Sequence, residues 1–190
     1  MRKQAALVCL TASMRRLLAL PVMVGFACVL AGVYGIVHNQ ISFTVGPDYF
    51  YALKFPQFRI PELLQSRVGA AYVGWQASWW MGLVIGIPIA VMSLGIPSPK
   101  QARRVFLRAA VLVVVIALAL GLVSLAFEPP MDHIPVPAAA KDPIGYGRAA
   151  MLHDTSYLAG LIGLVVGLIY VGAQVRAERR KALKPRSEGQ

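Results

Sequence analysis

Four long apolar stretches, separated by polar segments, dominate the hydrophobic pattern of the chain. Each is at least about 20 residues long, the length that an α-helix needs to cross the hydrocarbon core of a bilayer. They cover residues 17–38, 70–95, 105–127 and 152–173. The pattern therefore predicts an all-α membrane protein, a single domain built as a bundle of four transmembrane helices.

The charged residues are distributed unequally between the polar segments. Fourteen of the 19 lysines and arginines precede the first stretch, lie between the second and third or in the first turn of the third, or follow the fourth. Six of the eight acidic residues lie in the other two segments or in the first turn of the fourth stretch. The positive-inside rule then places both termini and the segments 96–104 and 175–190 in the cytoplasm, and the segments 39–69 and 128–151 outside. This predicts a multi-pass protein of the cell inner membrane.

The composition agrees with this class, because 57% of the residues are hydrophobic and only 14% are charged. The net charge of +11 follows from the cytoplasmic cations, which also attract anionic lipid headgroups. We therefore expect membrane lipid, and no nucleic acid, as a partner. Whether Met1 or Met14 is the true start stays open.

The two external segments differ in character. Aromatic and charged residues alternate after the first stretch, and Gly46-Pro47-Asp48 is typical of a helix start. We expect a short interfacial helix from about Asp48 to Phe55 that lies on the outer leaflet. Residues 128–151 are rich in proline, which predicts an irregular connection.

Small residues recur at every fourth position of the second stretch. This spacing keeps one stripe of a helix free of bulky side chains, so a neighbouring helix can approach closely. Pro88 predicts a kink near Val84, and the third stretch, rich in valine and leucine, is expected to be the most exposed to lipid. The stripe consists of Ala70, Gly74, Ser78, Gly82, Gly86 and Ala90, and shorter stripes are Ala27, Ala31 and Gly35 in the first stretch and Ala159, Gly163 and Gly167 in the fourth.

Three polar residues at the external ends of the first and fourth stretches are candidate ligands. If these helices adjoin, His38, His153 and Asp154 could meet near the outer interface, and imidazole with carboxylate suits a divalent transition metal or a proton relay. The alternative is structural: Asp154 caps the first turn of a helix and the histidines hydrogen-bond headgroups or water. The structural interpretation is favoured, because the histidines lack the spacing of a recognised metal motif.

Aromatic residues form the second candidate cluster. Trp75, Trp79 and Trp80 fit the inner edge of an interfacial aromatic belt, or else line a pocket for a lipid or cation. Tyr49 and Tyr157 are further candidates for a ligand or interface at the external face. The chain has no nucleotide-binding loop, hydrolase elbow, zinc-helix motif or haem-attachment cysteine pair, so no catalytic set is predicted.

Several short motifs resemble those of an uncharacterised family of small bacterial four-span integral membrane proteins, to which no function is assigned. The likeness extends from the first apolar stretch to the fourth, so it implies the same four-span fold and no activity. The motifs are His38-Asn39-Gln40-Ile41-Ser42-Phe43-Thr44, Tyr49-Phe50 with Lys54-Phe55 and Gln57-Phe58, Trp79-Trp80-Met81-Gly82-Leu83, His153-Asp154, Ser156-Tyr157-Leu158 and Gly160-Leu161-Ile162-Gly163.

The sequence thus favours a non-enzymatic inner-membrane protein whose external face binds a partner, lipid or ion. A protein partner or a homo-oligomer stays open. One alternative is a small transporter or channel subunit that acts as an oligomer, and a second is a protein that binds a metal or haem. The external-site hypothesis makes one structural claim, namely that His38 and His153 lie close enough for one ligand to touch both.

Overall fold

The computed structural model describes residues 2–183, with side chains from residue 18 onwards, and this part of the chain is helical without any strand. Three helices are long and apolar enough to cross a membrane, and the pair α4 and α5, bent by 42° at a short break, passes the same test together. The long helices are α1 (Arg2–Val45), α4 (Arg67–Ser78), α5 (Met81–Ser93), α6 (Pro99–Ser124) and α7 (Pro143–Leu183). The part of the predicted cytoplasmic segment from 184 to 190 lies outside the described residues.

The helices extend further than the apolar stretches predicted. α1 continues to Val45 and α7 begins at Pro143, so residues 39–45 and 143–151 are helical instead of belonging to external loops. At the start of α7 the Asp142 carboxylate accepts a hydrogen bond from Gly145 N (2.9 Å), and Pro143 needs no amide partner. Likewise, α6 begins at Pro99 behind the capping Ser98. Apolar content marks the membrane-crossing part of a helix, whereas capping residues mark its ends.

The second predicted span contains a break upstream of the position near Val84 where a kink was expected. The chain bends between α4 and α5 at Trp79 and Trp80, where Gly82 N and Leu83 N reach back only three residues to the carbonyls of those tryptophans. Pro88 lies inside α5, downstream of the break. The break therefore lies upstream of the predicted kink, and a local change in hydrogen-bond register accompanies it.

The predicted small-residue stripe on α4 and α5 packs against α1. A Cβ atom built on Gly74 would collide with the backbone of Gly35, and one built on Gly82 would collide with the backbone of Cys28. In α7, Gly163 lies against Val113 of α6 in the same way. Helix backbones thus approach closely at the positions the pattern indicated.

The expectation that the third stretch is the most exposed was wrong. In α6, 39% of the most apolar window is buried inside the protein, compared with 22% in α1 and 33% in α7. The reason is a second small-residue face that packs on the other helices. Its buried members are Ala102, Ala109, Ala110, Ala117 and Gly121.

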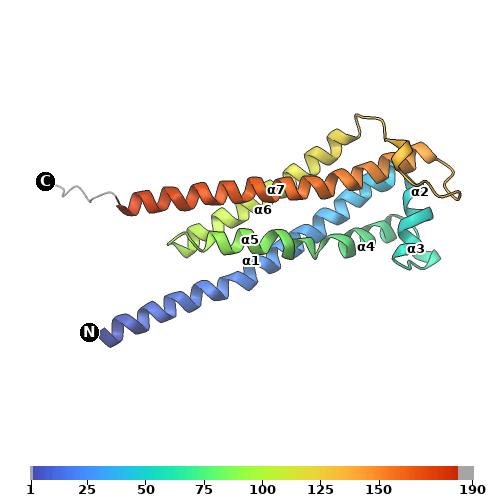
Figure 1. The fold of residues 1–190 in the computed structure, drawn as a ribbon. Helices are drawn as coiled ribbons and strands as arrows, with labels where there is room; N and C mark the ends of the chain where they lie inside the picture. Colours follow the sequence, from blue (N-terminus) through green and yellow to red (C-terminus); the bar gives the residue numbers. More distant parts are fainter. Residues whose placement is uncertain (1, 184–190) are drawn as a thin grey trace.

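A helical cap covers the end of the bundle opposite the termini (Figure 1). It comprises α2 (Pro47–Tyr49), the π-helical η1 (Phe50–Lys54) and α3 (Phe55–Gln57), which together correspond to the short helix predicted after the first span. Phe50 and Phe55 are fully buried, and Tyr49 packs edge-on against Tyr146 of α7. The cap therefore lies on the bundle through its aromatic side chains.

The connections at this end are short or irregular. The 3₁₀ helices η2 (Glu62–Leu64) and η3 (Met131–His133) interrupt them. The carboxylate of Asp48 accepts hydrogen bonds from the backbone N–H groups of Lys141 and Asp142, each at 2.5 Å, and so ties the proline-rich segment to the cap.

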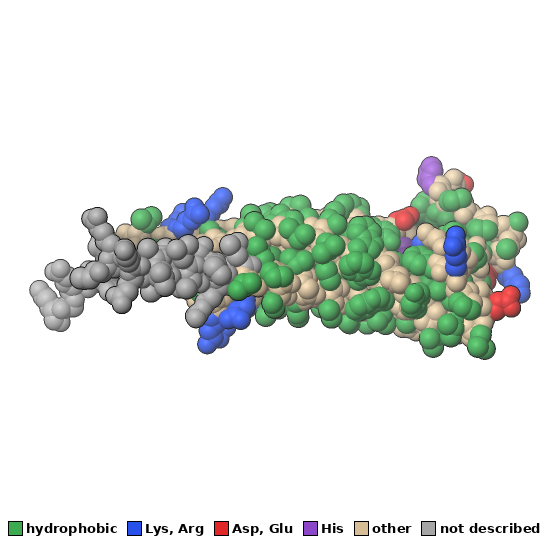
Figure 2. Space-filling view, turned by 90° about the horizontal axis from the view of Figure 1, so that it is seen from below, with side chains coloured by type: hydrophobic (Ala, Val, Ile, Leu, Met, Phe, Trp, Pro, Cys, Tyr) green, Lys and Arg blue, Asp and Glu red, His purple; other side chains and the backbone are tan. Residues whose placement is uncertain are grey.

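Both termini point away from the cap, and α1 and α7 run towards the same end of the molecule (Figure 1). Hydrophobic side chains cover the middle of the surface, whereas acidic side chains in this view lie towards the cap end (Figure 2). An apolar belt between two polar ends is the surface expected of a membrane protein.

Candidate functional site

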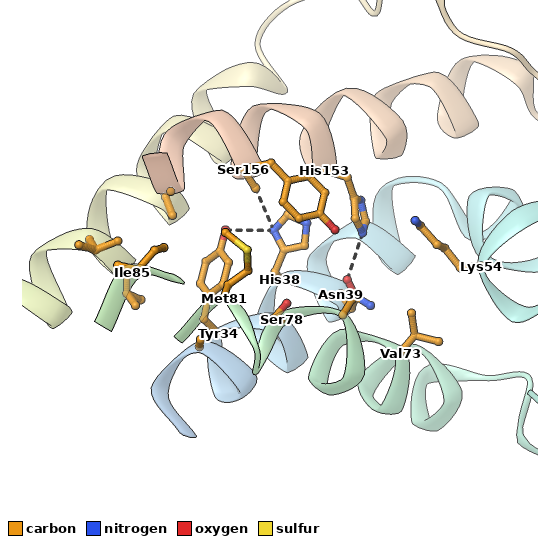
Figure 3. A pocket seen from close by; sticks show the side chains of 17 residues that line it. Tyr34, His38, Asn39, Lys54, Val73, Ser78, Met81, Ile85, His153 and Ser156 are labelled. Carbon is orange, nitrogen blue, oxygen red and sulfur yellow. Dashed lines mark hydrogen bonds between the residues drawn. The ribbon is translucent and has the colours of Figure 1, made fainter. Parts of the chain in front are cut away.

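A cavity of about 90 Å³ lies between the long helices near the cap. Every long helix contributes to its wall, and His38, His153 and Tyr157 are the candidate residues that line it (Figure 3). Its full lining is Ala31, Tyr34, His38, Asn39, Lys54, Val73, Ala77, Ser78, Met81, Ile85, Val113, Val114, Ala117, His153, Ser156, Tyr157 and Gly160.

His38 and His153 meet in this cavity. Their rings lie edge to face with centroids 4.6 Å apart, and both side chains are buried. The predicted approach of the two imidazoles is thus confirmed. α1 and α7 bring them together because each helix continues past its apolar stretch and keeps its histidine inside the bundle.

His153 is fixed by hydrogen bonds on both sides of its ring. Nδ1 lies 2.9 Å from the Ala149 carbonyl oxygen and 3.2 Å from Ser42 Oγ, and Nε2 lies 3.2 Å from Asn39 Oδ1. The Asn39 amide is oriented by its own bond, because Nδ2 donates to the Ala70 carbonyl (2.9 Å). Tyr49 also stacks beside this ring at 4.8 Å between centroids.

His38 is satisfied on one side only. Its Nδ1 lies 3.4 Å from the Tyr34 hydroxyl and 3.3 Å from Ser156 Oγ. Its Nε2 is buried and has no hydrogen-bond partner, the one such side-chain atom in the described part of the protein. A buried polar nitrogen without a partner is energetically unfavourable, by about 1–3 kcal/mol, so it marks a place where a ligand atom would be favourable.

Asp154 does not join the two histidines. It is exposed on α7 and is absent from the cavity lining. The helix begins at Pro143, so Asp154 lies in its interior instead of capping its start, and consecutive helical residues point in different directions. The predicted ligand set His38, His153 and Asp154 is therefore not assembled. No group of three or more metal-ligating side chains is arranged for a metal ion among residues whose side chains are described.

The geometry also bears on haem. A haem bound by both imidazoles would have to lie between the two rings. With centroids 4.6 Å apart and the rings edge to face, no macrocycle fits between them. The arrangement suits a ligand that hydrogen-bonds to a histidine edge.

The tryptophans lie outside the cavity. Trp75 packs where a Cβ on Gly32 of α1 would be, whereas Trp79 and Trp80 are 39% and 45% exposed on the outer surface beside the helix break. None of the three lines the cavity. The exposure of Trp79 and Trp80 fits the belt interpretation.

Lys54 of η1 lines the cavity at its cap end and was not predicted as a site residue. Its ammonium donates to Gln57 Oε1 (3.3 Å) and lies 5.2 Å from the centre of the Tyr49 ring. Burial lowers the pKa of Lys54 below its usual value, and the nearby Asp154 carboxylate partly opposes this. Burial, followed by Asp154, raises the pKa of Tyr49 well above the usual range, so its phenol stays neutral.

Four more polar residues at the site were not predicted from the sequence: Tyr34, Asn39, Ser42 and Ser156. A signal existed for two of them. Tyr34 precedes His38 by four residues and Ser156 follows His153 by three, spacings that place each on the same helical face as its histidine.

Comparison of the chain with protein-family models, with curated proteins and with solved structures finds no match in any of the three.

Proposed function

We propose that this chain is a non-enzymatic, four-span protein of the inner membrane that binds a membrane-borne amphiphile in the cavity beside His38 and His153. The observation that carries the proposal is the buried, unpartnered Nε2 of His38, a residue that lines that cavity. A ligand atom there would satisfy the nitrogen, and the empty volume would accommodate it.

The topology rests on the helices and the charges. Taken as one span, the bent pair α4–α5 adds a fourth crossing to those of the three long helices. Both termini then lie on one side, and the cations near them make that side cytoplasmic by the positive-inside rule. The cap, the histidine pair and the cavity belong to the external half of the bundle.

The shape and polarity of the cavity favour an amphiphile. Lys54 and His153 lie at its cap end, Ile85 lies at the opposite end, and Met81 lies between them beside Tyr34 and His38 (Figure 3). A second, apolar cavity of about 50 Å³ shares Met81 and Ile85 and continues to Phe106. A molecule with a polar head and an apolar chain matches this gradient.

The same gradient disfavours the alternative of a transporter or channel within one chain. A conduit needs a polar pathway through the bundle. Beyond Ile85 the buried residues on the described helices are mainly apolar, with Ile89, Phe106 and Val171 in the core. Because the polar part of the cavity ends at this apolar core, the arrangement suits binding of a ligand and not conduction through the bundle.

The proposal is tested by a substitution that fills the space where the two cavities adjoin. Ala31 lines both, so Ala31→Leu should lower the affinity for a dodecyl-chain probe, measured by native mass spectrometry of the protein released from lipid nanodiscs. The control is Ala119→Leu, on the exposed face of α6. Equal binding by both variants and the unaltered protein would contradict the proposed cavity.

The orientation is tested separately. Leu63 is 93% exposed in η2, beyond the membrane-crossing helices. A cysteine introduced there should react with an impermeant maleimide in intact cells, and a fusion at the C-terminus should be protected. If the C-terminal fusion is accessible from outside and the cysteine at position 63 is not, the orientation is the reverse of the proposed one.

A further inference from the structure

The cavity presents positive charge and hydrogen-bond donors without any acidic side chain. Lys54 is half-buried in its lining, and no Asp or Glu lines it. The ion pair found among the described side chains, Lys181 with Glu178, lies far along α7. Lys54 therefore has no carboxylate bound to it, although Asp154 on the outer face of α7 acts on it through space.

Both nitrogens of His153 face acceptor atoms. Nδ1 is 2.9 Å from the Ala149 carbonyl, and Nε2 faces Asn39 Oδ1, whose identity as the oxygen is fixed by the Asn39 bond to Ala70. A neutral imidazole has one N–H and an imidazolium has two. The Ser42 hydroxyl, 3.2 Å from Nδ1, can donate to this nitrogen while the Nε2 N–H donates to Asn39 Oδ1, so the protein supplies a partner for each nitrogen of His153 and the contact with a ligand falls to His38.

His38 supplies a further donor. Two hydroxyls, from Tyr34 and Ser156, lie at its Nδ1 and each can donate a proton to it. With Nδ1 as the acceptor, the proton of the ring is on Nε2, which is the unpartnered atom. The ligand must then offer an acceptor to this N–H.

We infer that the head group bound here is an oxygen anion, a carboxylate or a phosphate, held between Lys54 and the histidine pair with its apolar chain directed towards Ile85. This inference rests on the proposed function and specifies its ligand. The groups that face the head-group site are Lys54, His38 and His153, with the phenols of Tyr34 and Tyr157 and, outside the lining, Tyr49 and the carboxylate of Asp154. Within the lining these groups are cationic or donate hydrogen bonds, and the one carboxylate, Asp154, lies outside it, so an anionic head is favoured over a neutral one.

The test compares three probes with the same chain: dodecanoate, dodecyl phosphate and the neutral dodecanol. We expect the unaltered protein in nanodiscs to bind at least one anionic probe about tenfold or more tightly than dodecanol, the difference that one charge-assisted hydrogen bond supplies. If dodecanoate binds more tightly than dodecyl phosphate, the head group is a carboxylate, and if dodecyl phosphate binds more tightly, it is a phosphate.

Variants of Lys54 sharpen the test. Lys54→Gln should reduce the preference for the anion to within about threefold, whereas Lys54→Arg should restore it. The matched control is Lys141→Gln, because Lys141 is an exposed external cation outside the cavity. Its preference should equal that of the unaltered protein.

The outcomes separate the two proposals. If dodecanol binds as tightly as both anions, and Ala31→Leu still blocks it, the cavity binds amphiphiles and the anionic head group is overturned. Full retention of the preference in Lys54→Gln would overturn the anionic head group as well. If none of the probes binds in a manner that Ala31→Leu weakens, the proposed function itself is wrong.

Discussion

The imidazole of His38 lies edge to face against that of His153, yet the two rings differ in how completely the protein satisfies them. His153 has partners at both nitrogens, whereas His38 Nε2 has none. One ring is held by the fold, and the other keeps a free nitrogen for a ligand.

This difference predicts unequal effects of substitution. His153→Phe removes the partner of the buried Asn39 oxygen, and should destabilise the protein by about 1–3 kcal/mol. His38→Phe relieves an unpartnered nitrogen and should destabilise it less. Thermal unfolding in the same detergent measures both, and a larger loss for His38→Phe would contradict the assignment.

The contact between α5 and α1 predicts a second effect. A Cβ on Gly82 meets the backbone of Cys28, so Gly82→Ala should force the helices apart and destabilise the protein by about 1–3 kcal/mol, and Gly82→Leu should prevent folding. The control is Gly25→Ala on the open face of α1, where a Cβ has no neighbour within 4 Å. Unfolding temperatures of the two alanine variants should differ, and equal values would refute the close packing.

The environment of Lys54 predicts a pH dependence. Because burial lowers its pKa from the ordinary 10.5, the ammonium loses its proton at a lower pH than an exposed lysine does, and anion binding should weaken as the pH rises through that value. Dodecyl sulfonate is the suitable probe because its own charge does not titrate in this range. Lys54→Arg should remove the alkaline decline, and a decline that persists in this variant would assign it to another group.

The link between Asp48 and the proline-rich segment predicts a local effect. Asp48→Ala removes the acceptor of the Lys141 and Asp142 amides, so their hydrogen exchange should accelerate and α7 should fray from Pro143. Asp48→Asn keeps one acceptor oxygen and should give an intermediate rate. Unchanged exchange in Asp48→Ala would show that other contacts hold this segment.

The features that the sequence predicted are those set by periodicity. The small residues at Gly74, Gly82 and Gly86 indicated close packing, and they lie against α1. The three or four candidate membrane helices follow from the apolar stretches. The approach of His38 and His153 follows from their equivalent positions at the external ends of two apolar stretches, once α1 and α7 lie side by side.

The features that were missed depend on tertiary contacts or on capping. Asp142-Pro143 was a readable start signal for α7, and missing it gave Asp154 the wrong role. The break at Trp79 and Trp80 has no local signal comparable to Pro88. Lys54 reaches the cavity only because the cap folds over the bundle, which no spacing in the sequence indicates.

The lengths of α1 and α7 have a consequence on the other side of the membrane. With 44 and 41 residues they are about 66 Å and 61 Å long, about twice a hydrocarbon core of about 30 Å. Each helix has one end near the cap, so the additional length of both extends beyond the membrane at the opposite end of the molecule. There the two helices diverge (Figure 1). In the proposed topology this side is cytoplasmic, so a molecule that binds both helix ends there would lie well clear of the lipid surface, and moving these ends together or apart would displace the helices that enclose the cavity.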